Sequence, residues 1–156
     1  NKRSYNTNLS RIRFSSIITM ENNTPKSGFN VQNIILIESE FSRVNQVHFD
    51  KEHIQNNLDI HVDTAVNGTT INVAETVTIT QLYSDIEQVK IKVKMVGLFE
   101  QFGEALIPAE KFGRVNGAAI IFPFIREHIA SLSQKASIPP IILPTVNFAN
   151  SEENQE

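Results

Sequence analysis

The chain lacks cysteine and tryptophan altogether, and its aromatic residues are ten phenylalanines and two tyrosines among 156 residues. Without cysteine it can form no disulfide and use no thiolate chemistry, which fits a reducing compartment, so we expect a cytoplasmic protein. Long hydrophobic runs are also missing. None approaches the roughly 18 residues that a membrane-spanning helix needs, so we expect no membrane insertion.

Charge excludes a further class of partner. The net charge is −3 and the pI about 5.8, which does not favour nucleic acid as a partner. The segment 1–19 has four basic residues and no acid: Lys2, Arg3, Arg11 and Arg13. Its composition superficially suits an organellar transit peptide. We prefer Met20 as the natural start and exclude 1–19 from the fold; the rest then has a net charge of −7. We expect residues 1–28 to be a disordered or non-native lead.

Alternating apolar residues predict four strands, at 29–42, 58–66, 71–80 and 89–95. The first turns apolar on both faces in its middle, which is typical of a strand covered on both sides. Asn67-Gly68 is a strong hairpin signal between the second and third strands, and Ser84-Asp85 separates the third from the fourth. The sequence therefore predicts an antiparallel sheet with one face in water.

One long helix is expected after the sheet, from about residue 108 to residue 135. Pro123 lies inside it and should kink it, because proline leaves the carbonyl of Ala119 without its donor. An apolar segment at 138–148 follows, and its three prolines impose an extended path. The fold class is thus α+β, with one domain at 29–148 and an acidic tail at 149–156.

The expected helix has more apolar surface than one sheet can cover. Its main stripe includes Ala118, Phe122 and Ile125, whereas Ile121 and Phe124 form a second apolar side. Gly117 is small enough to let another helix approach closely. We therefore expect self-association through an interface containing Gly117, Ile121, Phe124 and His128.

The polar residues carry no clear chemistry. Asp59, His61 and Asp63 share one strand face and could in principle ligate a metal, but a solvated face is the more common arrangement. Three lysines, at 90, 92 and 94, form a basic stripe. Few aromatic residues lie beside it, which argues against nucleic-acid binding. No nucleophile elbow or phosphate loop is present. We expect no enzyme, no metal and no cofactor.

What remains is apolar surface in predicted loops, and loops so rich in apolar residues usually line a groove. The candidates for an apolar binding groove are Phe49, Ile54, Phe99, Phe102, Ile138, Ile141, Leu143, Val146 and Phe148.

Several blocks resemble one known family. The segment Phe-Pro-Phe-Ile-Arg-Glu-His-Ile at 122–129, the proline-rich loop at 139–144 and Val-Asn-Phe at 146–148 are similar to the SecB protein-export chaperones, and the strands extend the resemblance over about 20–150. The resemblance implies a four-stranded sheet with helices on one side, assembled as a dimer of dimers. It also implies an ATP-independent holdase that binds unfolded secretory precursors and passes them to the SecA motor. The apolar substrate groove of the family, carried over to this chain, implies as its lining Phe49, Ile54, Phe99, Ile138, Pro139, Ile141, Leu143 and Val146.

Two features depart from that family. SecB proteins dock SecA largely through acids on the outer sheet face; Glu38 matches one such position, but Ser42 and Lys92 stand where acids are expected. The family also has a second helix after Val-Asn-Phe, where only 149–156 remain here. The resemblance therefore supports client binding better than transfer to SecA. The alternative is a SecB-like chaperone dedicated to an antitoxin or another specific client, and a metal-dependent enzyme using Asp59, His61 and Asp63 is the alternative of another class.

Overall fold

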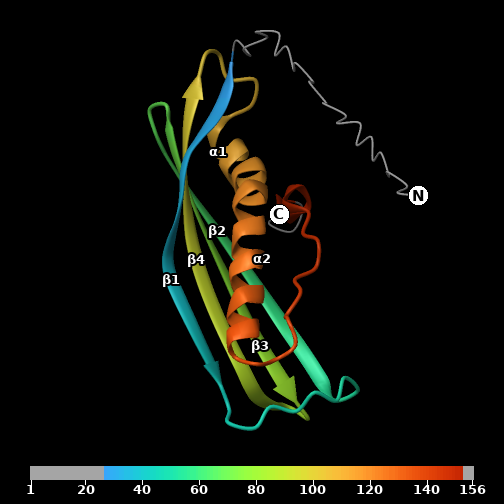
Figure 1. Cartoon of the computed structure of the whole chain (residues 1–156). Helices are drawn as coiled ribbons and strands as arrows, with labels where there is room; N and C mark the ends of the chain where they lie inside the picture. The colour runs from blue at the N-terminus through green and yellow to red at the C-terminus, as the bar shows by residue number, and fades with distance from the viewer. Residues whose placement is uncertain (1–26, 153–156) are drawn as a thin grey trace, which may run out of the picture.

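The computed structural model describes residues 27–152. Four strands form one sheet: β1 Gly28–Arg43, β2 Ile54–Asn67, β3 Thr70–Tyr83 and β4 Ile86–Phe102. Their spatial order is β1-β4-β3-β2, and every neighbouring pair is antiparallel. A helical rod lies across one face of the sheet, and no other element of residues 27–152 covers the opposite face (Figure 1). The expected α+β class and four-stranded antiparallel sheet are confirmed.

The rod has three parts. A short α1 (Ala109–Lys111) continues into a π-helical turn, η1 (Phe112–Gly117), and then into α2 (Ala118–Lys135). After α2 an extended ribbon, residues 138–147, runs back along the rod and ends in a 3₁₀ turn, η2 (Phe148–Glu152). None of the helices within 27–152 combines the length and the apolar character needed to cross a membrane. The π turn was not expected from the sequence.

Tight turns fix the strand register. The β2–β3 hairpin turns at Gly68, whose φ of 61° is easy only for glycine, and Asn67 pairs with Thr70 across it. Ser84 and Asp85 both have positive φ, 47° and 66°, as the turn between β3 and β4 requires. The hairpins anticipated at Asn67-Gly68 and Ser84-Asp85 are confirmed.

The core lies between the rod and the central strands β3 and β4. Alternate residues of both strands are buried beneath Ile121, Ile125 and Ile129 of α2. Glycine allows the close approach: a Cβ at Gly97 would lie 2.8 Å from the Cδ1 atom of Ile121, and one at Gly117 would lie 2.9 Å from a Val73 methyl. Neither position can take a larger residue without moving the rod.

Two boundaries differ from the sequence prediction. β2 begins at Ile54, inside the segment expected to be loop, because it pairs with Tyr83 at the end of β3. β4 continues to Phe102, well past the predicted end near Met95. Gly97, just after that predicted end, is an inner-face residue of the strand that makes room for the helix. Phe99 therefore lies in the sheet and not in a loop.

The predicted covering of β1 is wrong for the single chain. β1 is an edge strand, paired only with β4, and its partner register shifts twice, as β-bulges do. Apolar side chains on both of its faces are exposed: Val31, Ile35, Leu36 and Ile37. The residues whose pattern predicted a doubly covered strand are thus left exposed by the described part of their own chain.

The prediction for residues 1–19, including Met20 as the start, falls on residues outside those described. The expected lead 1–28 overlaps the structure only at its end, where β1 begins at Gly28. The beginning of the expected acidic tail, 149–152, lies in η2.

Candidate binding groove

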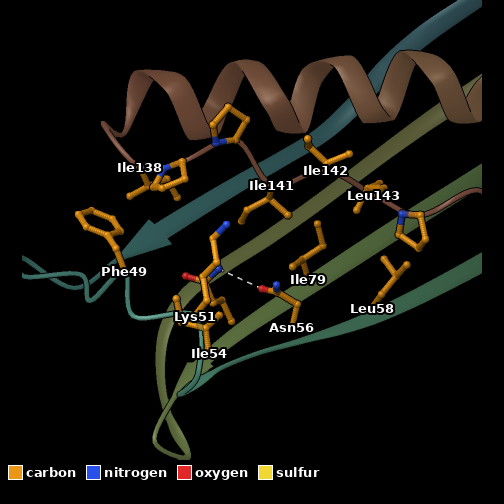
Figure 2. Close-up of a pocket in the computed structure, with 14 residues that line it drawn as sticks. Phe49, Lys51, Ile54, Asn56, Leu58, Ile79, Ile138, Ile141, Ile142 and Leu143 are labelled. Atoms are coloured by element: carbon orange, nitrogen blue, oxygen red, sulfur yellow. Dashed lines mark hydrogen bonds between the residues drawn. The ribbon is translucent and has the colours of Figure 1, made fainter.

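An open cavity of about 410 Å³ lies where the rod ends, between the ribbon, the sheet and the connection from β1 to β2 (Figure 2). The ribbon gives one wall, the β1–β2 connection gives the other, and β2 and β3 give the floor. The lining residues are Phe49, Lys51, Ile54, Asn56, Leu58, Ile79, Gln81, Ile138, Pro139, Pro140, Ile141, Ile142, Leu143 and Pro144. We call this cavity the groove.

Three buried residues anchor the ribbon wall. Ile138, Ile141 and Leu143 are buried in the core, whereas Ile142 between them is 81% exposed. Ser133 fastens the ribbon to α2, since its hydroxyl donates to the Ile129 carbonyl at 2.8 Å and accepts from the Ile141 N–H at 3.4 Å. Three prolines offer no N–H that could close the segment into a helix, so it stays extended beside the groove.

The opposite wall carries a large exposed ring. Phe49 is 54% exposed and lies across from Ile138 (Figure 2). Its neighbour His48 stacks on Tyr83 with ring centroids 4.3 Å apart, and His53 meets the same ring edge-on at 5.9 Å. Asp50 lies 2.7 Å from the ring of His53, and that hydrogen bond lowers the pKa of the Asp50 carboxyl. Aromatic packing on Tyr83 thus fixes His48 and His53, which stand on either side of Phe49 in this wall.

The floor mixes apolar and amide side chains. Leu58 and Ile79 are directly opposite each other on β2 and β3, on the face turned to the ribbon. Beside them the Gln81 side chain donates to the Asn56 amide oxygen at 3.0 Å. Lys51 is the one charged residue of the lining. The groove can therefore take apolar side chains and can offer polar groups to a peptide backbone.

The structure brings together six of the ten predicted groove residues: Phe49, Ile54, Ile138, Pro139, Ile141 and Leu143. The placement of Phe99 in the groove is wrong. Its side chain is fully buried and meets Phe112 edge-on at 5.3 Å, because β4 continues through it under the rod.

The other three predicted groove residues also lie outside the lining. Phe102 is at the far end of β4, paired with Gly28. Phe148 is 6% exposed and packs against Phe122 at 5.6 Å, and Val146 is half-buried against the same core. Phe148 and Val146 thus attach the end of the ribbon to the core and do not line the groove.

Sequence reasoning missed the polar and floor residues. Leu58 and Ile79 stand at inward positions of their alternating patterns, so the strand period could have found them. Nothing in the sequence marks Lys51, Asn56 or Gln81, whose position depends on where the ribbon passes.

The structure buries some residues of the predicted subunit interface and leaves others exposed. Gly117 and Ile121 face the sheet and are buried, so their assignment to a free helix side is wrong in the folded chain. Phe124 is 51% exposed and Ile120 is 36% exposed. His128, on the same side, makes a 2.8 Å hydrogen bond with Ser39 of β1. The exposed side of α2 therefore adjoins the uncovered strand β1.

The outer sheet face carries paired charges. Lys92 donates to the Glu38 carboxylate at 2.9 Å, and this bond lowers the pKa of Glu38 and raises that of Lys92. At the free β2 edge the ring of His61 lies 3.1 Å from Asp63. No cluster of three or more potential metal ligands occurs among the described residues. The Asp59, His61 and Asp63 face carries no more than that exposed pair.

Comparison with known proteins decides the family. The family model "SecB: Preprotein translocase subunit SecB" matches residues 21–155. The chain belongs to the SecB family. This SecB-family chain is 31% identical over 134 residues to "Protein-export protein SecB" of Paraburkholderia phymatum, which covers 82% of this chain and 83% of that protein. It is 30% identical over 138 residues to "Uncharacterized protein MJ0357" of Methanocaldococcus jannaschii, with 85% and 87% covered.

A solved structure agrees with the fold. The Mycobacterium tuberculosis Rv1957 SecB-like chaperone, determined with a ChAD peptide from the Rv1956 HigA1 antitoxin, matches with a TM-score of 0.64 over 76% of this chain and 90% of that one. At 13% identity this likeness shows the fold alone. The resemblance read from the sequence is thus confirmed, and family membership supports a chaperone of protein export.

Proposed function

We propose that this SecB-family chain is an ATP-independent holdase that binds unfolded polypeptides in the groove. One observation carries the proposal: an open, largely apolar cavity of about 410 Å³ presents large side chains to solvent, with Phe49 54% and Ile142 81% exposed. Apolar attraction has no direction, so such a surface binds many sequences that expose aliphatic or aromatic residues. The related SecB-like chaperone was solved in complex with a peptide, which makes a polypeptide a reasonable occupant here.

The size of the groove argues for modest affinity per chain. A client segment that removes roughly 300 Å² of apolar surface from water gains about 7 kcal/mol. Association costs at least about 4 kcal/mol of that gain. Weak single sites become useful when several are linked, because one long unfolded client can occupy more than one. We therefore propose a homo-oligomer, a dimer of dimers as in the family, working in the cytoplasm without enzymatic activity or a cofactor.

Suppression of aggregation tests the holdase. The purified protein at stoichiometric ratio should prevent light scattering by a chemically unfolded client on dilution, without ATP. Ile142→Asp should weaken this at least several-fold, since it sets a charge where an apolar contact is needed. Leu106→Asp is the matched control: Leu106 is 88% exposed but lies outside the groove. Equal activity of the two variants, or no suppression by the unaltered protein, sinks the proposal.

Transfer of the client to SecA is a separate step. The outer face carries Lys92 bonded to Glu38 where the family places acids, so we propose a weaker contact with SecA than with the client. Pull-down of the client-loaded chain with and without SecA tests this. Retention of SecA only when Lys92 is changed to Glu would support the electrostatic reason, whereas equally tight capture by both forms would contradict it.

A further inference from the structure

Arg43 joins the two walls of the groove. It is the last residue of β1, and its guanidinium donates to three backbone carbonyls. Two belong to the β1–β2 connection, Val44 at 2.9 Å and Asn45 at 2.7 Å. The third is that of Ala136, at the end of α2 and two residues before the ribbon begins. A cation at this place also satisfies a carbonyl that the helix itself leaves unpaired.

Gln88 holds the same connection from the sheet. Its side chain is 4% exposed and pairs with the backbone of His48 as a neighbouring strand would: it accepts from the His48 N–H and donates to the His48 carbonyl, both at 3.0 Å. The Gln88 main-chain carbonyl accepts from the Val44 N–H at 3.0 Å. Its side chain also donates to Gln81 of the floor at 2.8 Å.

These contacts place Phe49. The connection between β1 and β2 spans ten residues, from Val44 to His53, and has no helix or strand of its own. Most of its side chains are exposed, and Val47 alone among them is buried. Phe49 follows His48 directly, so the Gln88 contacts fix the backbone on which that ring stands. Arg43 fixes the start of the connection against the ribbon.

We propose that Arg43 and Gln88 are positioning residues that hold the two walls at a fixed separation, so that clients meet a groove already open. This inference rests on the proposed function and concerns the same groove. We call the hydrogen bonds of Arg43 and Gln88 the clamp. Without the clamp, the connection has to be ordered when the client binds, and fixing each residue carries an entropic cost. Losing either side chain should then weaken client binding although neither contacts the client.

The test measures affinity and wall separation together. Gln88→Met keeps the side-chain length and Arg43→Met keeps an unbranched apolar stem, but both remove the hydrogen bonds. We expect each to raise the Kd for a fluorescently labelled unfolded client about tenfold, the order of effect that losing such bonds produces. Lys90→Met is the matched control, because Lys90 pairs across from Ser42 at the same end of the sheet but is exposed and outside the groove.

The absence of cysteine makes the second readout clean. Spin labels are attached to two introduced cysteines, Gln46→Cys on the connection and Thr145→Cys on the ribbon. These are the only thiols of the chain, and both positions lie outside the groove lining. The distance distribution between the labels should be narrow in the otherwise unaltered chain and in Lys90→Met, and broad in Arg43→Met and Gln88→Met. A client in excess should narrow it again. A role in stability alone would leave the distribution of the folded variants unchanged.

The outcomes separate the two proposals. If the unaltered chain binds no client, the holdase fails, whereas the distance measurement still decides whether the clamp exists. If it binds and the two variants bind equally well or keep a narrow distribution, the clamp is overturned. Should Arg43→Met fail to fold, Arg43→Lys keeps the charge but cannot reach three carbonyls. It should bind a few-fold more weakly with a broadened distribution, and wild-type values in both measurements would refute the clamp.

Discussion

Glu75 is a carboxyl buried in the core without a partner. It lies in the middle of β3, on the face under the rod, between Val62 and Met95 of the neighbouring strands. Its exposed fraction is zero, and neither carboxylate oxygen has a hydrogen-bond partner among residues 27–152. Desolvation raises its pKa from 4.5 to about 8, so the folded chain holds this group protonated at neutral pH. A β-strand pattern of alternating residues could place Glu75 inward, but only the covering rod makes that position dry.

This carboxyl predicts a pH-dependent stability. Because the folded pKa lies above the unfolded one, the folded state binds the extra proton between pH 4.5 and 8. The contribution of Glu75 to stability is therefore greatest below pH 4.5, falls by at most about 1.4 kcal/mol per pH unit as the pH rises, and levels off above 8. Glu75→Leu should remove this decline. Urea unfolding at pH 5 and pH 8, at one protein concentration, measures this. The free energy of unfolding of Glu75→Leu relative to the unaltered chain should be on the order of 3 kcal/mol higher at pH 8 than at pH 5.

The matched control is Glu87→Leu, which removes a carboxyl from an exposed position of β4. It should leave the pH dependence of stability as in the unaltered chain. If the Glu75 variant keeps the same decline between pH 5 and 8, another group causes it and the buried carboxyl is ionised in the folded state.

At the level of elements, the period-2 and turn signals predicted the strands well, since alternation and the Asn67-Gly68 turn are local properties. The end of β4 could not be predicted from such local signals, because a glycine such as Gly97, considered without the helix, indicates a turn. Only the helix above it reveals a strand glycine kept for close packing. The sequence also could not predict which residues of the rod face the sheet. The π turn holds an extra residue, which rotates the residues of α2 about the helix axis and ends the simple helical period.

The close approach at Gly97 predicts a costly substitution. An added Cβ would lie 2.6 Å from the ring of Phe99 and 2.8 Å from Ile121, and both side chains are fully buried. Gly97→Ala should lower the free energy of unfolding by roughly 1–3 kcal/mol, as overpacking does. Asn116→Ala, at a rod position away from this contact, is the control and should change stability little. Urea denaturation checks both, and equal midpoints would show that the rod can shift without penalty.

At the scale of the whole molecule, one set of uncovered apolar residues lies on the edge strand β1 and on the exposed side of α2, which the hydrogen bond between Ser39 and His128 brings together. Leu36 is 45%, Phe124 51% and Ile37 56% exposed. The unpaired backbone of an edge strand beside such side chains is a template for another chain. The sequence predicted that cover was needed, from the doubly apolar β1 and from Phe124. It could not say which helix residues remain free, because Ile121 and Phe124 are both apolar and only the sheet distinguishes them.

This surface predicts assembly through Phe124. In a dimer of dimers built on it, the ring passes from half-exposed to buried, so Phe124→Asp would bury an unpaired charge at every copy and should shift the chain to smaller species. Sedimentation velocity over a range of concentrations measures this. Leu106→Asp adds the same charge at an 88% exposed site away from this surface and should leave the oligomer intact. Because residues of one chain line the groove, the dissociated variant should still bind a short apolar peptide, but should hold a long unfolded client more weakly through lost avidity. An oligomer unchanged by Phe124→Asp would place the interface elsewhere.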